Sequence, residues 1–400
     1  RKEELGENHP DYASSLNNLG LLYNNMRKYK EAIPLLTEAL RITNMNAGNN
    51  STAYATYLDN LATSYNRLGD FEKAEPLYLE AMRIRKEKLG VSHPDYASSL
   101  NNLSAMYSRA SDYSKAENLI VESLRIQKEE HGNKHPEYTQ SLMNLAVIYL
   151  ETNNQAKALE VFKEINSNYI NYLNDNFSFL SESEKVNFLE TIDFNFEVFY
   201  SFALEYCKQN PEIATDLLNL RISTKGIVLS SNTRIRNIIS KTGNAELNNI
   251  FDKLCELKDE ILKASNYSLQ EQQKRGINTA QLENEANETE KELSRKSESY
   301  RQIYEEKNVS FTNIRNALSP NEAAIEFVDF RYWKTKWSDT IYYTALVTTR
   351  GQKHPTLVKL CCLDELTRIL SVDANNEESY ASNKQKSSCR NSWRWSRNKV

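Results

Sequence analysis

The sequence is poor in residues that interrupt helices and in residues that cross-link small domains. It contains 10 glycines, 8 prolines and 5 cysteines among 400 residues. Collagen-like and low-complexity chains are rich in glycine and proline, so this composition excludes both and favours a mainly helical globular protein. The cysteines are odd in number and follow no metal-ligand or paired-bridge spacing, which favours a reducing, cytoplasmic setting without a metal or other cofactor.

Long hydrophobic runs and an excess of either charge are also missing. No stretch approaches the roughly 18 apolar residues that span a bilayer, and no apolar signal segment stands at the N-terminus. The formal net charge is −4, with 26% charged and 40% hydrophobic residues. Because nucleic acids and anionic membranes attract positively charged surfaces, we expect neither as a partner.

What the sequence does contain is an internal repeat. The segment HPDYASSLNNL at residues 9–19 returns unchanged at 93–103, and related segments begin at residues 51 and 135, which sets the period at 42 residues. A period of this length predicts a solenoid of stacked helical units. The four predicted units are 9–50, 51–92, 93–134 and 135–176.

Each unit is predicted to be a helical hairpin. Leu16, Leu19 and Tyr23 form an apolar stripe at helical spacing on a first helix, and the small residues Ala32 and Ala39 allow a second helix to approach closely. Prolines open the first helix in three units, where a missing amide donor costs nothing: Pro10, Pro94 and Pro136. We expect the histidines that precede them to be cap residues: His9, His93 and His135.

The hairpin pattern resembles a known repeat family. The spacing of Leu19, Gly20, Tyr23, Ala32 and Ala39 resembles that of the tetratricopeptide repeat. The 42-residue unit is similar to the longer variant in kinesin light chains and many bacterial regulatory proteins. Since RKEELG at 1–6 matches RKEKLG at 85–90, we expect the chain to open inside the second helix of an earlier repeat.

The candidate binding residues lie on the first helices. Such solenoids bind partners on a concave surface, and the side chains opposite the apolar stripes are candidates for this groove: Asn17, Asn18, Asn24, Asn25, Asp59, Asn60, Asn66, Arg67, Asn101, Asn102, Arg109 and Asn144. Asparagine both donates and accepts, which suits recognition of a peptide backbone. The alternative is that the asparagines recurring in every unit bond to the neighbouring repeat as a structural ladder. Arg67 and Arg109 are candidates for acidic ligand groups.

The pattern changes after the repeats. Leu247, Leu254, Leu257 and Ile261 follow a heptad-like seam that returns after Gly276 toward Tyr300 and Ile303, which predicts an antiparallel helical hairpin. The runs EAAIEFVDFRYW, DTIYYTALVTTR and PTLVKLCCL predict a short strand meander. We therefore divide the chain into the end of an earlier repeat (1–8), the repeats (9–176), a helical connector (177–240), a long helical hairpin (241–318), the first strands of a further domain (319–372) and a disordered or aberrant tail (373–400).

This order resembles the bacterial family in which tetratricopeptide repeats precede a caspase-like CHAT domain. The resemblance rests on LSESEKVNFL at 180–189, LRISTKGIVLSS at 220–231, the charged hairpin and the strand pair at 323–330 and 341–348. It implies a mainly α fold, a solenoid followed by a helical hairpin and the truncated start of an α/β caspase-like domain. It also implies a cysteine peptidase module regulated by what the repeats bind.

The residues of that chemistry are missing from the sequence. Neither a His-Gly nor a Ser-Ala-Cys-like motif occurs downstream of the strands, so we assign no catalytic residue. His354 is some 20 Å from Cys361 along an extended chain, and Cys361 and Cys362 are expected to be buried strand residues.

We therefore predict that the chain binds a peptide or protein partner and does not cleave it. The alternatives are an active cysteine endopeptidase in the full-length product and a pure assembly scaffold. The sequence leaves the oligomeric state open.

Overall fold

The protein is described by a computed structural model that covers residues 6–176, 181–228, 239, 243–264, 267, 272, 274–296, 309–334 and 336–367. The chain divides into two compact units. The first consists of Arg1–Thr191 and Leu220–Asn308, and the second of Ile192–Asn219 and Val309–Val400.

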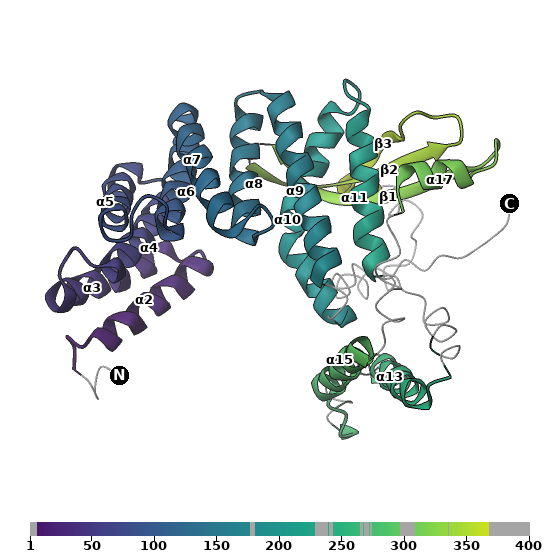
Figure 1. Cartoon of the computed structure of the whole chain (residues 1–400), viewed down its shortest axis with the longest axis horizontal. Helices are drawn as coiled ribbons and strands as arrows, with labels where there is room; N and C mark the ends of the chain where they lie inside the picture. The colour runs from purple at the N-terminus through teal and green to yellow at the C-terminus, as the bar shows by residue number, and fades with distance from the viewer. Residues whose placement is uncertain are drawn as a thin grey trace. The chain divides into compact units, whose positions relative to one another are not determined.

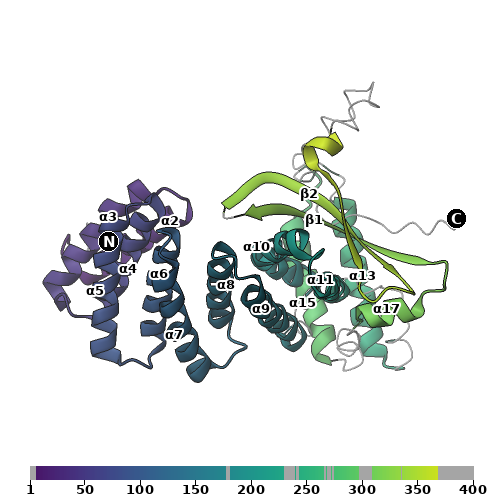
Figure 2. The same ribbon diagram turned by 90° about the horizontal axis from the view of Figure 1, so that it is seen from above.

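The first unit begins with a solenoid of helical hairpins (Figures 1 and 2). The pairs are α2 (Pro10–Asn25) with α3 (Tyr29–Ala47), α4 (Thr52–Leu68) with α5 (Phe71–Leu89), α6 (Pro94–Arg109) with α7 (Tyr113–His131), and α8 (Pro136–Glu151) with α9 (Gln155–Asn176). The second helix of one hairpin packs against the first helix of the next, as where Leu36 and Leu40 meet Leu58 and Leu61. The predicted solenoid is confirmed.

Histidine caps open three of the first helices. The backbone amides two residues further on donate to Nδ1 of His9, His93 and His135 at 3.2, 3.1 and 3.3 Å. Ser51 takes this place in the second hairpin, where its Oγ accepts from the amide of Tyr54 at 3.2 Å. Each cap satisfies an amide at the helix start that has no partner within the helix, so the cap prediction is confirmed.

Two kinds of turn join the helices. Between hairpins, Gly48, Gly90 and Gly132 have φ of 76°, 91° and 79° with ψ near 168°, a region that essentially only glycine adopts. Within the third hairpin, Ser111 has a positive φ of 64°, in the left-handed region that costs a side-chain-bearing residue less. The glycines between hairpins are therefore required by backbone geometry.

The predicted helical hairpin is formed by α13 (Ala245–Ala264) and α15 (Thr279–Lys296). Leu247, Leu254 and Leu257 of α13 pack with Leu293 of α15 in one buried cluster. Lys296 pairs with Glu246, and Lys253 with Glu285, so the helices run antiparallel as predicted. The predicted contributions of Tyr300 and Ile303 lie outside the described residues.

The second unit contains a three-stranded antiparallel sheet of order β1-β2-β3, with β1 (Ala323–Lys334), β2 (Lys336–Thr349), β3 (Thr356–Cys362) and the short helix α17 (Phe311–Ala317). The predicted meander is confirmed. Figure 2 shows β1 and β2 lying over α10 (Glu182–Tyr206), which is followed by α11 (Glu212–Val228).

Helix α10 also satisfies the outer edge of β1. The amide of Arg331 donates to Glu197 Oε1 at 3.0 Å, and that of Trp333 donates to Ser201 Oγ at 2.9 Å. These side chains satisfy amides that an edge strand otherwise leaves unpaired.

The prediction that Cys361 and Cys362 are buried is wrong. Both are only half-buried, because among the described strands β3 pairs with β2 alone and so forms an edge of the sheet.

A matched pair of glycine substitutions tests the turn geometry. Gly90→Ala is expected to lower the free energy of unfolding by about 1–3 kcal/mol, because alanine is strained at that φ and ψ. Ser111→Gly is expected to raise it by up to about 1 kcal/mol, because it relieves a left-handed residue. Urea unfolding followed by circular dichroism measures both, and equal losses in the two variants would contradict this account.

Candidate protein-interaction surface

Three of the four asparagines that recur in every unit bond to the preceding first helix and form a ladder between hairpins: Asn60, Asn102 and Asn144. Asn60 Nδ2 donates to Asn17 Oδ1 at 2.8 Å, and Asn144 Nδ2 donates to Asn101 Oδ1 at 2.9 Å. Each rung joins residues of two successive first helices that lie 43 positions apart. This arrangement is the one expected if the asparagines bond to the neighbouring repeat and not to a ligand.

Other groove candidates also bond to a neighbouring hairpin. Ser64 Oγ donates to Asn24 Oδ1 at 2.8 Å. Arg109 Nε donates to Asn66 Oδ1 at 3.2 Å. These contacts join the first helices α2 to α4 and α4 to α6, and so extend the ladder toward the C-terminal ends of the helices.

The ladder contains one buried ion pair. Asp59 and Arg85 are 4% and 7% exposed and are in direct contact, and Arg85 Nη1 also donates to Ser99 Oγ of the next hairpin at 2.6 Å. Burial raises the pKa of Asp59 to about 6, against the charge of Arg85 and hydrogen bonds from Arg85 and Asn102, which lower it.

The other hairpins place neutral residues at the two positions of this pair. The first hairpin has Asn17 and Thr43, and the third has Asn101 and Gln127. Sequence reasoning missed Arg85, although a signal existed. The one unit with aspartate at the first position is also the one with arginine at the second.

The candidates therefore fall into three groups, of which the half-buried one contains Asn24, Asn60, Asn101, Asn102 and Asn144. Asn17, Asp59 and Asn66 are only 6%, 4% and 4% exposed, so they lie between hairpins and not on an open surface. The side chains that remain exposed are Asn18, Asn25, Arg67 and Arg109. Ligand contact stays a prediction, and these four side chains are accessible enough to make it.

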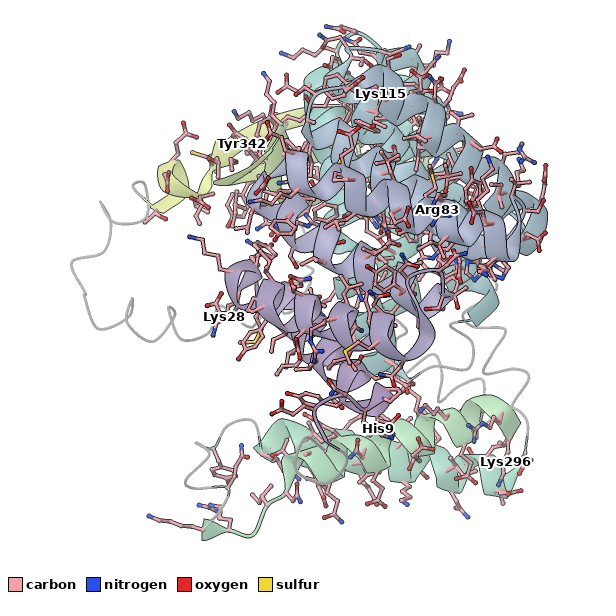
Figure 3. The ribbon with its side chains drawn as sticks, turned by 90° about the vertical axis from the view of Figure 1, so that its left-hand side faces the viewer. His9, Lys28, Arg83, Lys115, Lys296 and Tyr342 are labelled. Carbon is pink, nitrogen blue, oxygen red and sulfur yellow. The ribbon has the colours of Figure 1, made fainter. Side chains whose placement is uncertain are left out.

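The exposed arginines of the first helices differ from those of the second helices. Arg41, Arg83 and Arg125 each contact a glutamate three residues before them at 2.7 Å, and Arg83 is labelled on α5 in Figure 3. Within the described residues, Arg67 and Arg109 have no such carboxylate. Burial, and then the charge of Arg67, lower the pKa of Arg109. The positive charge of Arg67 thus acts on Arg109, and no carboxylate among the described residues contacts either guanidinium group.

The structure does not bring a cysteine and histidine pair together in the sheet. His354 Nδ1 lies 3.0 Å from Thr215 Oγ1 in the turn before β3, whereas Cys361 and Cys362 lie at the far end of that strand. An extended strand of this length separates them by roughly 20 Å. Within the described ranges, no three histidine, cysteine, aspartate or glutamate side chains gather as metal ligands.

None of the described helices has the length and apolar character needed to cross a membrane.

The ladder predicts different effects for two equivalent asparagines. Asn144→Ala is expected to lower the free energy of unfolding by about 1 kcal/mol, because it removes a rung and leaves the Asn101 oxygen unpaired. Asn18→Ala is expected to change it by less than about 0.5 kcal/mol, because Asn18 is exposed. Chemical denaturation compares them, and an equal loss would remove the ladder as an explanation.

The buried pair predicts a strong coupling in a double-mutant cycle. Asp59→Asn and Arg85→Gln introduce the residues of the third hairpin, and each alone is expected to cost about 3–5 kcal/mol because it leaves a buried charge. The double variant is expected to recover most of that loss. Additive losses would show that the two charges do not depend on each other.

The same cycle has a pH dependence. Arg85 lowers the pKa of Asp59, so in Arg85→Gln this pKa is expected to lie further above the wild-type value of about 6. The loss of stability in Arg85→Gln is therefore expected to shrink as the pH falls toward about 6, where the unpaired carboxyl is already protonated, and to change no further below it. Denaturation at several pH values measures this. A loss that stays constant with pH would contradict the assignment to Asp59.

The comparison with known protein families agrees with this architecture. The tetratricopeptide repeat family matches residues 1–45 and 52–129, and a second form of the same repeat matches residues 140–169. A search of curated proteins found no match.

Three solved structures are similar to parts of the chain. BtubC (BKLC) from P. vanneervenii is 26% identical, with a TM-score of 0.38, over 40% of this chain and 65% of that one. The chain thus spans less than two thirds of that relative. A putative kinesin light chain from Podosopora anserina with nearly identical TPR-like repeats is 19% identical, with a TM-score of 0.42, over 55% and 96% of the two chains. A substituted form of the same Podosopora anserina protein is 20% identical, with a TM-score of 0.42, over 54% and 95%.

The repeat matches coincide with the stacked hairpins α2–α9. The chain therefore contains tetratricopeptide repeats, a module that generally binds peptides or proteins.

Proposed function

We propose that the chain is a tetratricopeptide interaction protein that binds an acidic segment of a peptide or protein partner at Arg67 and Arg109. In the intact product, this binding regulates an attached caspase-like CHAT module. The chain itself binds without cleaving.

The observation that supports the binding proposal is that two exposed arginines, Arg67 and Arg109, contact no carboxylate among the described residues. Arg67 and Arg109 occupy the same position in successive first helices, and burial and then the charge of Arg67 lower the pKa of Arg109. A carboxylate placed between them removes that repulsion, and a guanidinium group can hold it through two parallel hydrogen bonds. The paired Arg83 and Arg125 have carboxylates already.

Neighbouring exposed amides suit the same kind of ligand. Asn25 occupies the corresponding position in α2 and Glu151 that in α8, so the row reads asparagine, arginine, arginine, glutamate across the four hairpins. Asn25 can donate to a peptide carbonyl and accept from a peptide amide. The row therefore favours an extended peptide whose acidic residue meets the arginines.

The sheet of the second unit supports the proposal of an attached CHAT module. Val328 and Phe330 are 1% and 2% exposed on one face of β1, whereas Ile325 and Phe327 are 47% and 62% exposed on the other. An apolar outer face on a sheet is typical of a layer that further structure covers, as in an α/β domain. This fits the resemblance to a CHAT domain of which β1–β3 form a part.

Affinity capture from bacterial cell extract tests the binding half. The full chain serves as bait, and Arg67→Gln with Arg109→Gln is expected to lose the partner because the unpaired charges are gone. Wild-type capture is expected to weaken as salt rises from about 50 to about 300 mM, because ions screen exposed charges. Mass spectrometry identifies and quantifies the captured protein.

The matched control is Arg83→Gln with Arg125→Gln, which removes the same charge from the second helices and is expected to retain the partner. Circular dichroism establishes that both variants remain helical. A partner retained by the Arg67 and Arg109 variant would place the binding surface elsewhere.

A cleavage assay separates the proposal from the peptidase alternative. Incubation of the full chain with a peptide library is expected to give no new termini by mass spectrometry, because His354 and the β3 cysteines lie apart. Cleavage that iodoacetamide abolishes would favour an active cysteine peptidase.

A further inference from the structure

The last residue of α8 has a charge that its position in the helix disfavours. The positions equivalent to Glu151 at the ends of the other first helices hold Asn25, Arg67 and Arg109. The C-terminal end of a helix carries a partial negative charge, which favours a cation and disfavours a carboxylate. Arginine therefore suits this position, whereas the carboxylate of Glu151 is repelled by its own helix.

Glu151 also has no counter-charge among the described residues. Its Oε2 accepts a hydrogen bond from the hydroxyl of Tyr113 at 3.4 Å, but a neutral hydroxyl does not balance the charge. The side chain is half-buried, and burial raises the pKa of Glu151 against this hydrogen bond, which lowers it. By contrast, Glu117 of the preceding hairpin contacts Lys157 at 3.1 Å. Glu151 is thus a carboxylate that both its helix and its burial disfavour.

Arg109, the neighbouring residue of the row, does not supply the counter-charge. Its Nε donates to Asn66 Oδ1 at 3.2 Å, and its Nη2 donates to the Asn66 carbonyl oxygen at 3.4 Å. Both bonds direct the guanidinium group toward the preceding hairpin, whereas Glu151 belongs to the following one. The two opposite charges therefore stay apart, and both side chains keep accessible surface.

The spacing of the row sets the spacing of a ligand's charges. Successive first helices are in direct contact through the ladder, as where Asn144 Nδ2 meets Asn101 Oδ1 at 2.9 Å, so their axes lie about 8–10 Å apart. A polyproline II segment has three residues per turn and presents every third side chain on one side at intervals of about 9 Å. Such a segment, lying across the first helices, meets successive positions of the row with every third residue.

We propose that Glu151 selects a basic residue in the peptide segment that binds at Arg67 and Arg109. The segment has acidic residues opposite the arginines and a lysine or arginine opposite Glu151, at steps of three residues. That basic residue supplies the counter-charge that Glu151 lacks, which favours this segment over one that is acidic throughout. The inference rests on the proposed function, because Glu151 continues the row that the acidic residues occupy.

Three labelled peptides test the selection: GEPPEPPKG, GEPPEPPAG and GEPPEPPEG. Their prolines favour the polyproline II conformation, and the reversed sequences are included because a segment can cross the row in either direction. Fluorescence anisotropy measures binding to the full chain at about 50 mM salt, where screening is weak. In one of the two directions, the lysine peptide is expected to bind roughly three- to fivefold more tightly than the alanine peptide. The glutamate peptide is expected to bind more weakly than either.

Two substitutions at Glu151 make the result specific. Glu151→Gln is expected to remove the preference for the lysine peptide, and glutamine can still accept the bond from Tyr113. Glu151→Arg is expected to reverse the preference, so that the glutamate peptide binds most tightly, and arginine suits the end of a helix. The matched control is Glu129→Gln, which removes the same charge from α7, where Glu129 contacts Arg125 at 2.6 Å. The control is expected to keep the preference, and circular dichroism establishes that each variant remains helical.

The outcomes separate this inference from the proposed function. Binding of the alanine peptide that Arg67→Gln with Arg109→Gln abolishes supports the proposed function by itself. If that peptide binds and lysine adds nothing, or if the gain from lysine survives in Glu151→Gln, selection by Glu151 is overturned and the proposed function stands. If none of the peptides binds to the wild-type chain, both are overturned.

Discussion

The packing of one hairpin's second helix against the first helix of the next is the interaction on which the solenoid depends. Small residues allow this close approach, and Ala32 and Ala74 are fully buried in the clusters that join successive hairpins. No hairpin can bury its own apolar faces completely, so each is stable only with a neighbour. The 42-residue period places equivalent residues of successive units at equivalent contacts.

The polar ladder adds specificity to that apolar packing. Leucine and alanine contacts tolerate small shifts, whereas the amide of Asn60 or Asn144 must meet a single oxygen. The Asp59 and Arg85 pair goes further, because a buried charge is costly without its counter-charge, and both residues also bond to the third hairpin. This pair marks the junction between the second and third hairpins and distinguishes it from junctions with neutral residues.

Because the ladder asparagines hold hairpins together, they are less informative about binding than the exposed arginines. Removing the asparagines of the ladder weakens the fold itself, so loss of a partner in such variants would say little about a ligand site. Arg67 and Arg109 carry charge that the described part of the fold leaves without a carboxylate, and Arg83 and Arg125 offer the same chemistry with one. The comparison of the two pairs separates recognition from stability.

The sequence by itself determined the repeat, the hairpins, the histidine caps, the helical hairpin on either side of Gly276 and the strand meander, because each follows from local spacing and backbone preference. The tertiary structure decided which polar side chains face a neighbour and which face solvent. Adjacent residues such as Asn17 and Asn18 point about 100° apart on a helix, and a sequence does not state where the next helix lies. Identical residues can therefore differ in environment. Leu103 is buried and Leu19 is exposed, because burial depends on which helix packs against the segment and not on the segment itself.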